Sequence, residues 1–475
     1  MSAAAWSFAV DCALAPDAAA DTPLVGRVRA LFGLRQRQTR LYEGFALTLS
    51  PGELTVVIGP SGAGKSVLLR ELARQAARAV WVDATTLAGD DRPAVDALTP
   101  TGQAADRLDL AERLDVLSRC GLAEAAVLVC PARCLSAGQQ FRLALARAIC
   151  LARSQGPALL LVDEFGSSLD EMTARMLARQ LRKLVAAPAS ELACVAAVMR
   201  AELLAELRPA QVIVKPCDAP PRIDRPGAWP SPPREYDVTT WPIVAGGAED
   251  YAALARYHYL AGGPAVYKRI WAIRAPARAG LGDALAPAVA AVLVVTPPVV
   301  QCRARNAVLG DRYLRASRGE AGRLLGREIE CIARVIVHPM YRGAGLAVRL
   351  VRHALATAGA PLVEAMAAMG TVNPFFERAG MTAYPIPPDV HARRLLSAAD
   401  AVGLTPEQVS AVEPVKAVLA RADSPEARLL RHELDRYIAR GVPPHHRFGA
   451  EAVALACRHA TSECRYYLVE RPDKS

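Results

Sequence analysis

The stretch Gly59 to Ser66, which reads GPSGAGKS, decides the fold of the first half of the chain. It follows an apolar run at 53–58 and precedes a helical pattern, the context in which G-x-x-x-x-G-K-[ST] binds phosphate. Glycines allow backbone N–H groups to wrap phosphate oxygens at a helix N-terminus. We predict a loop that binds the β- and γ-phosphates of a nucleotide, formed by Gly59, Ser61, Gly62, Gly64 and Lys65, with Ser66 as a ligand of Mg²⁺.

Two acidic residues follow the apolar run ALLLV at 158–162. Such a run is typical of a buried strand in a parallel sheet. An acidic pair at the end of that strand suits a nucleotide site, because one carboxylate can hold the metal ion while the other activates the attacking water. We predict Asp163 as a ligand of Mg²⁺ and Glu164 as the catalytic base.

Two further motifs complete a recognisable order. LSAGQQ at 135–140 lies between the loop and the acidic pair, and SSLD at 167–170 follows that pair. With these four motifs the chain resembles the ABC-type ATPases over about residues 23–216. The resemblance implies a homodimer in which Ser136 and Gly138 of one subunit close over the ATP held by the other. It also places Gln139 and Asp170 among the nucleotide-binding residues.

The chain departs from this family at three places. Arg200 stands where the family has a switch histidine, so the resemblance leaves open whether ATP hydrolysis is fast. The aromatic residue that stacks on adenine is predicted to be Phe32, with Tyr42 in reserve. The stretch between Lys65 and Ser136 is short for the helical region that transporter ATPases use to engage a permease, so a transporter subunit is the weaker alternative.

A proline-rich segment divides the chain. Eight of the 27 residues from Pro216 to Pro242 are proline, and such a segment cannot hold a helix or a central strand. We predict an α/β fold with an ATPase domain at 1–216, a stiff linker at 217–243, a second α/β domain at 244–385 and a helical extension at 386–475.

The second domain carries another glycine-rich turn, at the end of the predicted strand 328–337. With Arg342, Gly345 and Ala347 in the pattern R/Q-x-x-G-x-G/A, the chain resembles the GNAT acetyltransferases over roughly 244–384. The resemblance implies that acetyl-CoA lies against this turn and that a backbone N–H at the end of the strand polarises the thioester. The acetyl-CoA-binding residues are predicted to be Val335, Val337, Arg342, Gly343, Gly345 and Ala347.

The second site has candidates for the general base but lacks the family's general acid. Glu330 is the candidate general base, with Glu328 behind it, although both also suit solvated charges at a strand edge. Phe376 stands where the family has a general-acid tyrosine, so another group or solvent has to protonate the CoA thiolate. The alternative is a domain that binds CoA without transferring its acyl group.

The charge and the cysteine content of the chain bear on its partners and on its cellular compartment. Lys and Arg number 57 against 47 acidic residues, and between Lys268 and Arg327 there are 11 basic residues but only three acidic ones. A nucleic-acid substrate explains this strip, and a solvated arginine-rich loop explains it equally well. Eleven cysteines without regular spacing favour reduced thiols and the cytoplasm, and the longest apolar stretch is too short to cross a membrane.

The preferred hypothesis joins the two halves. It is an enzyme in which an ATP-hydrolysing switch is coupled to acyl transfer from acetyl-CoA to an amine, with nucleic acid as one candidate acceptor. The alternatives are an ATP-dependent clamp with a CoA-sensing domain that transfers nothing, and the ATPase subunit of a transporter.

Overall fold

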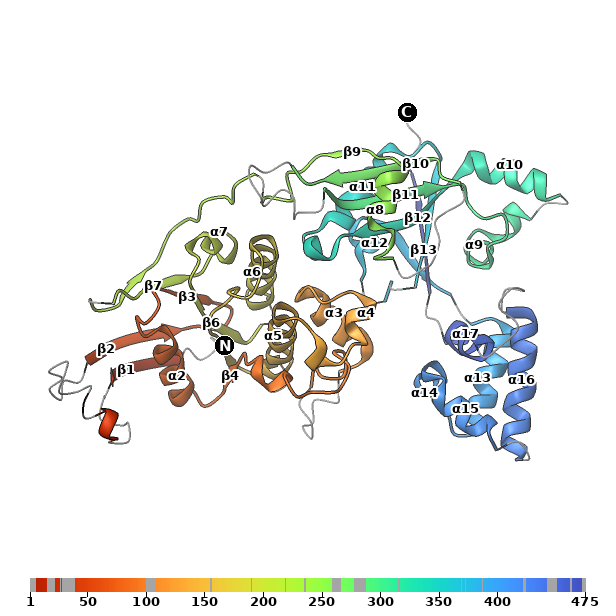
Figure 1. The fold of residues 1–475 in the computed structure, drawn as a ribbon. Helices are drawn as coiled ribbons and strands as arrows, with labels where there is room; N and C mark the ends of the chain where they lie inside the picture. Colours follow the sequence, from red (N-terminus) through yellow and green to blue (C-terminus); the bar gives the residue numbers. More distant parts are fainter. Residues whose placement is uncertain are drawn as a thin grey trace. The chain divides into compact units, whose positions relative to one another are not determined.

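The computed structural model describes residues 6–14, 22–25, 27, 39–99, 108–153, 156–188, 190–217, 219–234, 236–258, 266–276, 288–314, 317–368, 370–371, 373–386, 388–421, 424–441, 451–461 and 464–471. The chain divides into two compact units whose segments alternate along the sequence. Figure 1 shows the helices and strands of the chain, coloured from the N-terminus to the C-terminus. The first unit comprises Met1–Gly263, Ile270–Leu293 and Val335–Leu350, and the second comprises Pro264–Arg269, Val294–Arg334 and Val351–Ser475. The domain boundaries given above remain a prediction.

The first unit contains a six-stranded sheet with the strand order β4-β5-β6-β3-β7-β8. Neighbouring strands are parallel except for β7 and β8. Every residue of β5 and β6 is apolar and buried, as expected of parallel strands that are covered on both faces. The strands are β3 (Leu54–Ile58), β4 (Ala79–Trp81), β5 (Ala158–Val162), β6 (Leu192–Val198), β7 (Gln211–Val214) and β8 (Arg222–Asp224).

Two hydrophobic cores lie on the two faces of this sheet. Leu160 and Val162 of β5 belong to the core that also includes α5 and α6, whereas Leu159 and Leu161 belong to the core that includes α2, β1 and β2. This alternation follows from the two-residue period of a strand. The elements are β1 (Trp6–Leu14), β2 (Thr39–Leu49), α2 (Lys65–Gln75), η2 (Thr85–Leu87), α3 (Leu110–Arg119), α4 (Ala125–Leu128), η4 (Ala132–Cys134), α5 (Ala137–Arg153), α6 (Glu171–Val185), η5 (Ala201–Leu203) and α7 (Leu204–Leu207).

A second sheet has seven strands in the order β14-β15-β13-β12-β11-β10-β9. It is mixed, because β12 and β13 are parallel whereas β9 and β10, β13 and β15, and β14 and β15 are antiparallel. The strands are β9 (Ile243–Ala245), β10 (Arg269–Arg274), β11 (Val289–Thr296), β12 (Ile329–Val337), β13 (Leu362–Ala367), β14 (Thr382–Pro385) and β15 (Arg465–Glu470). With both sheets flanked by helices, the predicted α/β class is confirmed.

Short helices connect the strands of the second sheet. They are α8 (Ala248–Ala255), α9 (Arg303–Leu309), η7 (Gly310–Tyr313), α10 (Arg318–Glu328), η8 (Pro339–Tyr341), α11 (Leu346–Thr357) and α12 (Phe375–Arg378). The helix α11 follows β12 through η8 and the glycine turn, so the predicted strand–turn–helix order is present.

Five helices near the end of the chain form a cluster with a core of its own, which includes Leu395, Leu430, Leu434 and Cys457. The helices are α13 (Val390–Ala401), α14 (Pro406–Ala411), α15 (Glu413–Leu419), α16 (Pro425–Gly441) and α17 (Glu451–Ala460). The sequence predicts helices to the end of the chain, but β15 follows α17 and lies between β13 and β14. The helical cluster is therefore an insertion ahead of the last strand of the second sheet.

The proline-rich segment is packed along the first sheet. It contains β8, which pairs with β7, and its first residues accept hydrogen bonds from the buried Lys215 ammonium at Pro216 O (2.7 Å) and Ala219 O (3.3 Å). Further along, the Trp229 indole N–H donates to Pro209 O at 3.1 Å. Prolines lack a ladder donor, which confines such a segment to the sheet edge.

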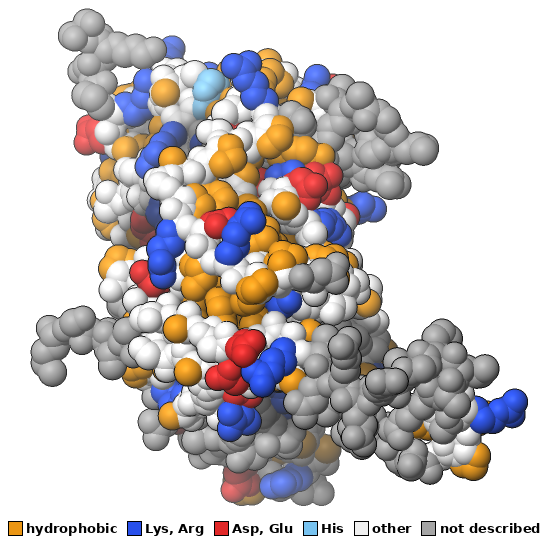
Figure 2. Space-filling model, turned by 90° about the vertical axis from the view of Figure 1, so that its left-hand side faces the viewer, with side chains coloured by type: hydrophobic (Ala, Val, Ile, Leu, Met, Phe, Trp, Pro, Cys, Tyr) orange, Lys and Arg blue, Asp and Glu red, His pale blue; other side chains and the backbone are white. Residues whose placement is uncertain are grey.

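Charges of both signs are interspersed on the face shown in Figure 2, and hydrophobic side chains gather along its middle. Within the described residues, every helix is too short or too polar to reach across a bilayer.

Candidate functional site

The loop at 59–64 joins β3 to α2 and requires glycine at three positions. A Cβ at Gly59 would collide with the carbonyl oxygen of Lys215, which belongs to the backbone and cannot turn away. Gly62 and Gly64 have φ values of +79° and +96°, in the left-handed region that other residues rarely adopt. The GPSGAGKS sequence therefore fixes the path of this backbone.

Lys65 and Ser66 begin α2, directly after this loop. The Lys65 side chain is buried, and its ammonium donates to Gly59 O at 2.8 Å and to Pro60 O at 2.9 Å. Ser61 is exposed within the loop. The first turn of α2, which is fully described, holds no acidic residue. Its positive helix end is thus available to an anion, as the sequence predicts for the phosphates of ATP.

The acidic pair follows β5 at the same edge of the sheet as the loop. Only β6 separates β5 from β3, and the three strands are parallel, so their carboxyl ends meet there. Asp163 Oδ1 accepts a hydrogen bond from the Glu164 backbone N–H at 3.0 Å. Glu164 has φ +48°, a strained conformation that often marks a functional residue. The structure thus brings Asp163 and Glu164 to the edge of the sheet that carries the phosphate loop.

The LSAGQQ stretch forms the start of α5. Ser136 N–H donates to Gln139 Oε1 at 3.0 Å, and Gln139 N–H donates to Ser136 Oγ at 3.4 Å, which together cap the helix. A Cβ at Gly138 would lie 3.1 Å from Ser168 O and 3.0 Å from Leu169 Cδ2. The LSAGQQ stretch, called the signature turn from here on, is therefore packed against the SSLD segment of its own chain.

Arg200 and Asp170 fix that segment from two sides. The Arg200 guanidinium, which follows β6, donates from Nη2 to Leu169 O at 2.7 Å and to Gly166 O at 3.1 Å. Asp170 caps α6 by accepting from the Thr173 N–H at 2.9 Å. At the position for which a switch residue is predicted, this chain has a guanidinium that is engaged with backbone carbonyls.

The adenine-stacking residue is not assigned by the structure. Phe32 lies outside the described residues. Tyr42 is only 2% exposed, and its hydroxyl donates to Gly64 O at 3.1 Å. Burial raises the pKa of Tyr42. Tyr42 thus supports the phosphate loop from inside the protein and has no exposed face for a base.

The second glycine turn follows β12, the strand that carries Val335 and Val337, and leads into α11, with Ala347 in the first turn of the helix. Gly343 and Gly345 have φ values of +76° and +87°. The Arg342 Nε–H donates to Val337 O at 3.3 Å. A Cβ at Gly345 would meet no atom within 4 Å, whereas one at Gly343 would collide with the Gln180 side chain, whose Nε2–H donates to Gly343 O at 2.5 Å.

A polar cluster beside this turn was not predicted as a site. Arg256 Nη2 donates to the Tyr257 hydroxyl at 2.6 Å, and that hydroxyl lies 3.1 Å from His338 Nε2. His338 Nδ1 accepts from the Met340 N–H at 3.2 Å, so in the neutral ring the proton resides on Nε2 and faces Tyr257. Burial, with the charges of Arg256 and Arg342, lowers the pKa of His338 to about 4. Tyr257 and His338 are 81 positions apart in the sequence, so no local pattern links them.

The two predicted acyl-transfer carboxylates are both paired. Glu330 is buried and forms a short ion pair with Arg269. Glu328 accepts from the Tyr313 hydroxyl at 2.8 Å and pairs with Arg312 at 2.9 Å. Their catalytic roles stay predictions. Phe376 is a core residue whose ring lies 4.8 Å from that of Tyr467.

The basic strip loses part of its charge to ion pairs. Arg305 is 0% exposed and forms a two-pronged contact with Glu364, at 2.8 and 2.7 Å. Arg274 pairs with Asp250 at 2.9 Å. Arg315 lies outside the described residues. The exposed arginines of α10 are Arg318, Arg323 and Arg327.

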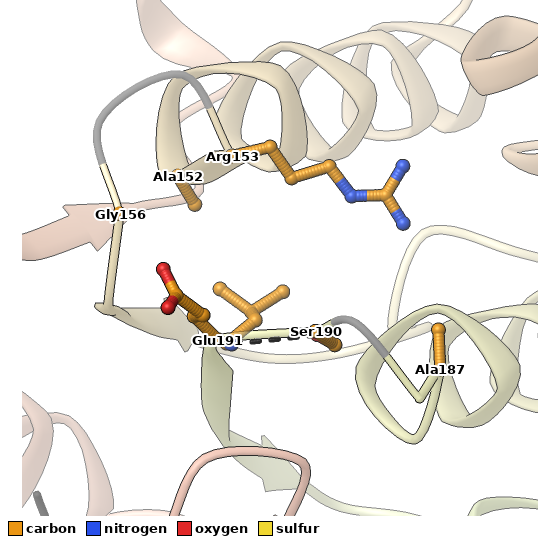
Figure 3. Close-up of a pocket in the computed structure, with 7 residues that line it drawn as sticks. Ala152, Arg153, Gly156, Ala187, Ser190 and Glu191 are labelled. Carbon is orange, nitrogen blue, oxygen red and sulfur yellow. Dashed lines mark hydrogen bonds between the residues drawn. The ribbon is translucent and has the colours of Figure 1, made fainter. Parts of the chain in front are cut away.

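A cavity of about 310 Å³ lies at the start of β5 and β6 (Figure 3). The acidic pair follows the other end of β5. Arg153 and Glu191 line it, and none of the predicted site residues does. Among the described residues, histidine, cysteine and carboxylate side chains form no cluster of three that suits a metal ion.

Comparisons with known proteins identify the first part of the chain. The family model "AAA ATPase domain" matches residues 23–195. The cytochrome c biogenesis ATP-binding export protein CcmA 2 of Cupriavidus metallidurans is 35% identical over 162 residues, which cover 29% of this chain and 74% of that protein. The aliphatic sulfonates import ATP-binding protein SsuB 1 of Rhodococcus jostii is 33% identical over 177 residues, covering 35% and 70%.

Among solved structures, one titled "Dimeric Structure of MJ0796, a Bacterial ABC Transporter Cassette" aligns with 17% identity and a TM-score of 0.32, over 40% of this chain and 93% of that chain. The identity to the two curated relatives, over more than two thirds of their length, establishes the family. The N-terminal part of this chain belongs to the ABC-type ATPases.

Proposed function

We propose that this chain hydrolyses ATP as a homodimer in which each subunit completes the nucleotide site of the other. The observation that carries the proposal is the common sheet edge at which Lys65 and the pair Asp163 and Glu164 stand. Lys65, with the N–H groups of the glycine loop, holds the phosphates, and Ser66 and Asp163 hold Mg²⁺, which neutralises phosphate charge. Ser136 and Gly138 reach the nucleotide of the partner.

Glu164 orients and deprotonates the attacking water. Its backbone is left-handed, and its backbone N–H donates to Asp163 Oδ1 at 3.0 Å, which fixes the main chain at this position. Arg200 holds the SSLD segment through backbone carbonyls and has no basic nitrogen to share a proton, because a guanidinium stays protonated. Hydrolysis is therefore slow, and the closed dimer is long-lived.

The test is the rate of phosphate release with Glu164→Gln beside Lys65→Ala. We expect Glu164→Gln to lower turnover by about 10²- to 10⁴-fold, the range for losing a general base, while ATP binding is retained. Lys65→Ala is expected to weaken ATP binding as well. Equal turnover in wild type and Glu164→Gln would contradict the proposal.

A second candidate function is acyl transfer from acetyl-CoA at the end of β12, and two features favour it. The parallel pairing with β13 covers only Ile329 to Ile332, although β12 continues to Val337. Gly345 leaves open space at the start of α11, and the first turn of that fully described helix has no acidic residue. These residues fit a pyrophosphate held by backbone N–H groups, and acetyl-CoA supplies the activated acyl group.

Tyr257 fills the role that Phe376 cannot. When the amine attacks, a carbon–nitrogen bond forms and the carbon–sulfur bond breaks. The nitrogen releases one proton to solvent, and the leaving thiolate needs one. The Tyr257 oxygen accepts from Arg256 and lies within hydrogen-bond distance of the protonated Nε2 of His338, which leaves its own O–H to donate. Tyr257 therefore protonates the sulfur.

This second function is tested with acetyl-labelled CoA, a cell extract and the full chain, with and without ATP. Labelled product that nuclease releases would establish a nucleic-acid acceptor, and labelled small amines would make the basic strip incidental. CoA binding without label transfer would instead support a CoA-sensing clamp. In the first two cases, Tyr257→Phe is expected to slow transfer by about 10²-fold or more.

A further inference from the structure

The helix α6 starts at the nucleotide site and reaches the second glycine turn by two routes. We infer that α6, with the segment 236–241, transmits the state of the nucleotide site to the turn at 342–345. We call residues 236–241 the strap. The inference rests on the proposed ATP-driven closure and adds the residues that carry its effect.

The first link is at the start of α6. Asp170 caps this helix, and Arg200 holds the residues just before it. Gly138 packs against the same SSLD segment. A change at the signature or SSLD residues, which nucleotide-driven closure involves, therefore acts directly on the N-terminus of α6.

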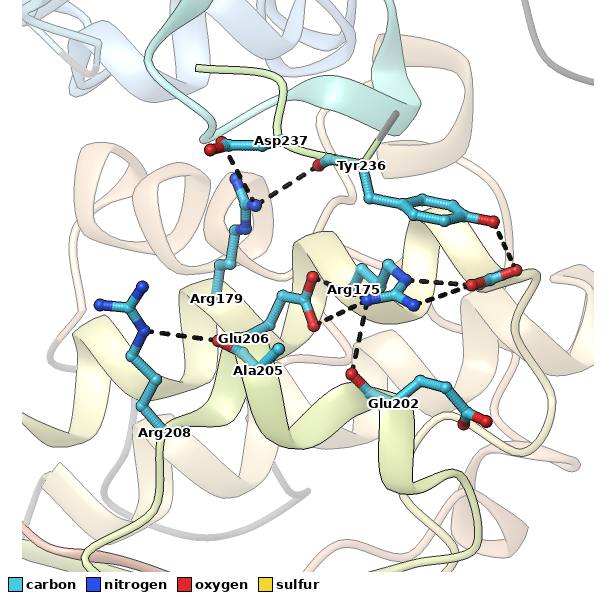
Figure 4. A network of polar contacts seen from close by, with 9 residues as sticks. Arg175, Arg179, Glu202, Ala205, Glu206, Arg208, Tyr236 and Asp237 are labelled. Carbon is cyan, nitrogen blue, oxygen red and sulfur yellow. Dashed lines mark hydrogen bonds and ion pairs between the residues drawn. The ribbon is translucent and has the colours of Figure 1, made fainter. Parts of the chain in front are cut away.

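The second link ties the strap to the first turns of α6 (Figure 4). Arg175 is 3% exposed, pairs with the fully buried Glu206 at 2.9 Å and with Glu171 at 2.9 Å, and stacks on the Tyr236 ring at 4.2 Å. The Tyr236 hydroxyl donates to Glu171 at 2.9 Å. Removing charges from water is costly, so a buried network persists only with well-matched geometry. It holds Tyr236 in one position on α6.

The third link ties the other end of the strap to α11. Arg349 Nη1 and Nη2 donate to Val238 O at 2.8 Å and to Trp241 O at 2.6 Å. The Trp241 ring is buried and meets that of Tyr341 edge to face, 5.3 Å between centroids. The strap thus contacts both the helix that follows the turn and the residue that precedes Arg342.

A direct contact runs parallel to the strap. Gln180, which is 6% exposed on α6, donates to Gly343 O at 2.5 Å, and its amide fills the space that a side chain at position 343 would need. Packed interfaces change between discrete arrangements and do not deform gradually. A shift of α6 therefore has to move the turn, and a ligand at the turn has to act back on α6.

The experiment is hydrogen exchange on the full chain, read at residues 341–350 with and without ATP. Glu164→Gln is the background, so that ATP persists. We expect ATP to change exchange at 341–350 several-fold. Gln180→Ala together with Arg349→Ala cuts both routes and is expected to abolish this change, whereas Lys183→Ala, an exposed position on α6, is expected to leave it intact.

ATP binding is measured on the same samples, so that failure of the inference can be told apart from failure of the proposed ATPase function. Bound ATP with no change at 341–350, or the same change after both routes are cut, would overturn the inference and leave the ATPase proposal standing. Absence of ATP binding in the background protein would overturn the proposed function and the inference with it. Arg179→Ala, which removes the 3.6 Å pair with Asp237 on the strap, is the second variant if the double variant does not fold, and it is expected to weaken the change.

Discussion

The phosphate loop at 59–66 and the glycine turn at 342–347 share one local plan, a strand followed by glycines and a helix, yet they differ in what holds them. Gly59 is confined by the backbone of Lys215, and the Lys65 ammonium is held by carbonyls of the loop itself. Gly343 is confined by a side chain, Gln180, from a helix far away in the sequence. The first turn is built to be constant, whereas the second depends on the position of α6.

The largest expected effect separates the two turns by stability. Gly59→Ala puts a methyl group into a backbone oxygen, and we expect a loss of about 3 kcal/mol or more in the free energy of unfolding. The methyl group of Gly345→Ala would enter open space, so its only cost is the left-handed backbone. We expect it to lower the free energy of unfolding by about 1–2 kcal/mol. Chemical denaturation measures both, and equal losses would break the comparison.

A second effect separates the turns by ligand. Lys65→Ala removes a charged donor to the phosphates, so we expect ATP affinity to fall by about 100-fold, corresponding to roughly 2.7 kcal/mol. Arg342→Ala is the matched variant at the other turn and is expected to leave ATP affinity within about twofold, because P-loop contacts are unchanged. Calorimetric titration with ATP checks both. Similar losses in the two variants would contradict the separate roles.

A third effect tests the dependence on α6. Gly343→Ala alone collides with Gln180, and we expect a loss of about 1–3 kcal/mol from overpacking and the left-handed backbone. In the background Gln180→Ala the same change is expected to cost about 1 kcal/mol less, since the collision is gone. Thermal unfolding of the wild type, the two single variants and the double variant gives the coupling energy between positions 343 and 180. If the losses in the single variants simply added up in the double variant, the two residues would not be coupled.

A fourth effect is a pH dependence at the second turn. The pKa of His338 is lowered from 6.5 to about 4, so the unfolded chain binds the proton more readily. The stability that His338 contributes is complete above about pH 6.5 and is lost as the pH falls toward about 4. We expect His338→Gln to make the free energy of unfolding depend less on pH in this window. His391→Gln, a substitution on α13, serves as the control. If the free energy of unfolding of the His338 variant varied with pH as strongly as that of the wild type, His338 would not be the source of the pH dependence.

Sequence reasoning succeeded where a motif carries its own geometry. The glycines of GPSGAGKS and the acidic pair after ALLLV dictate local backbone and strand ends, so the ATPase fold follows from them. It missed β15, because an insertion of helices hides a strand that returns to the sheet. Gln180 and Gly343 are 163 positions apart, and no local pattern links them.

The same limit affected the charges. The sequence places Arg305 in the basic strip. In the structure its side chain is buried and paired with Glu364, which lies 59 positions away. Glu330 was chosen by its place on a strand, and its partner Arg269 lies on another element. Side-chain pairing between distant elements is therefore what the sequence alone could not supply.

The most direct test of the account is the molar mass of the Glu164→Gln protein in solution with Mg²⁺ and ATP, measured by light scattering. The account predicts a shift from monomer to dimer that requires ATP and that Ser136→Arg, which blocks the signature turn, abolishes. A monomer at saturating ATP, with binding verified in the same sample, would contradict it.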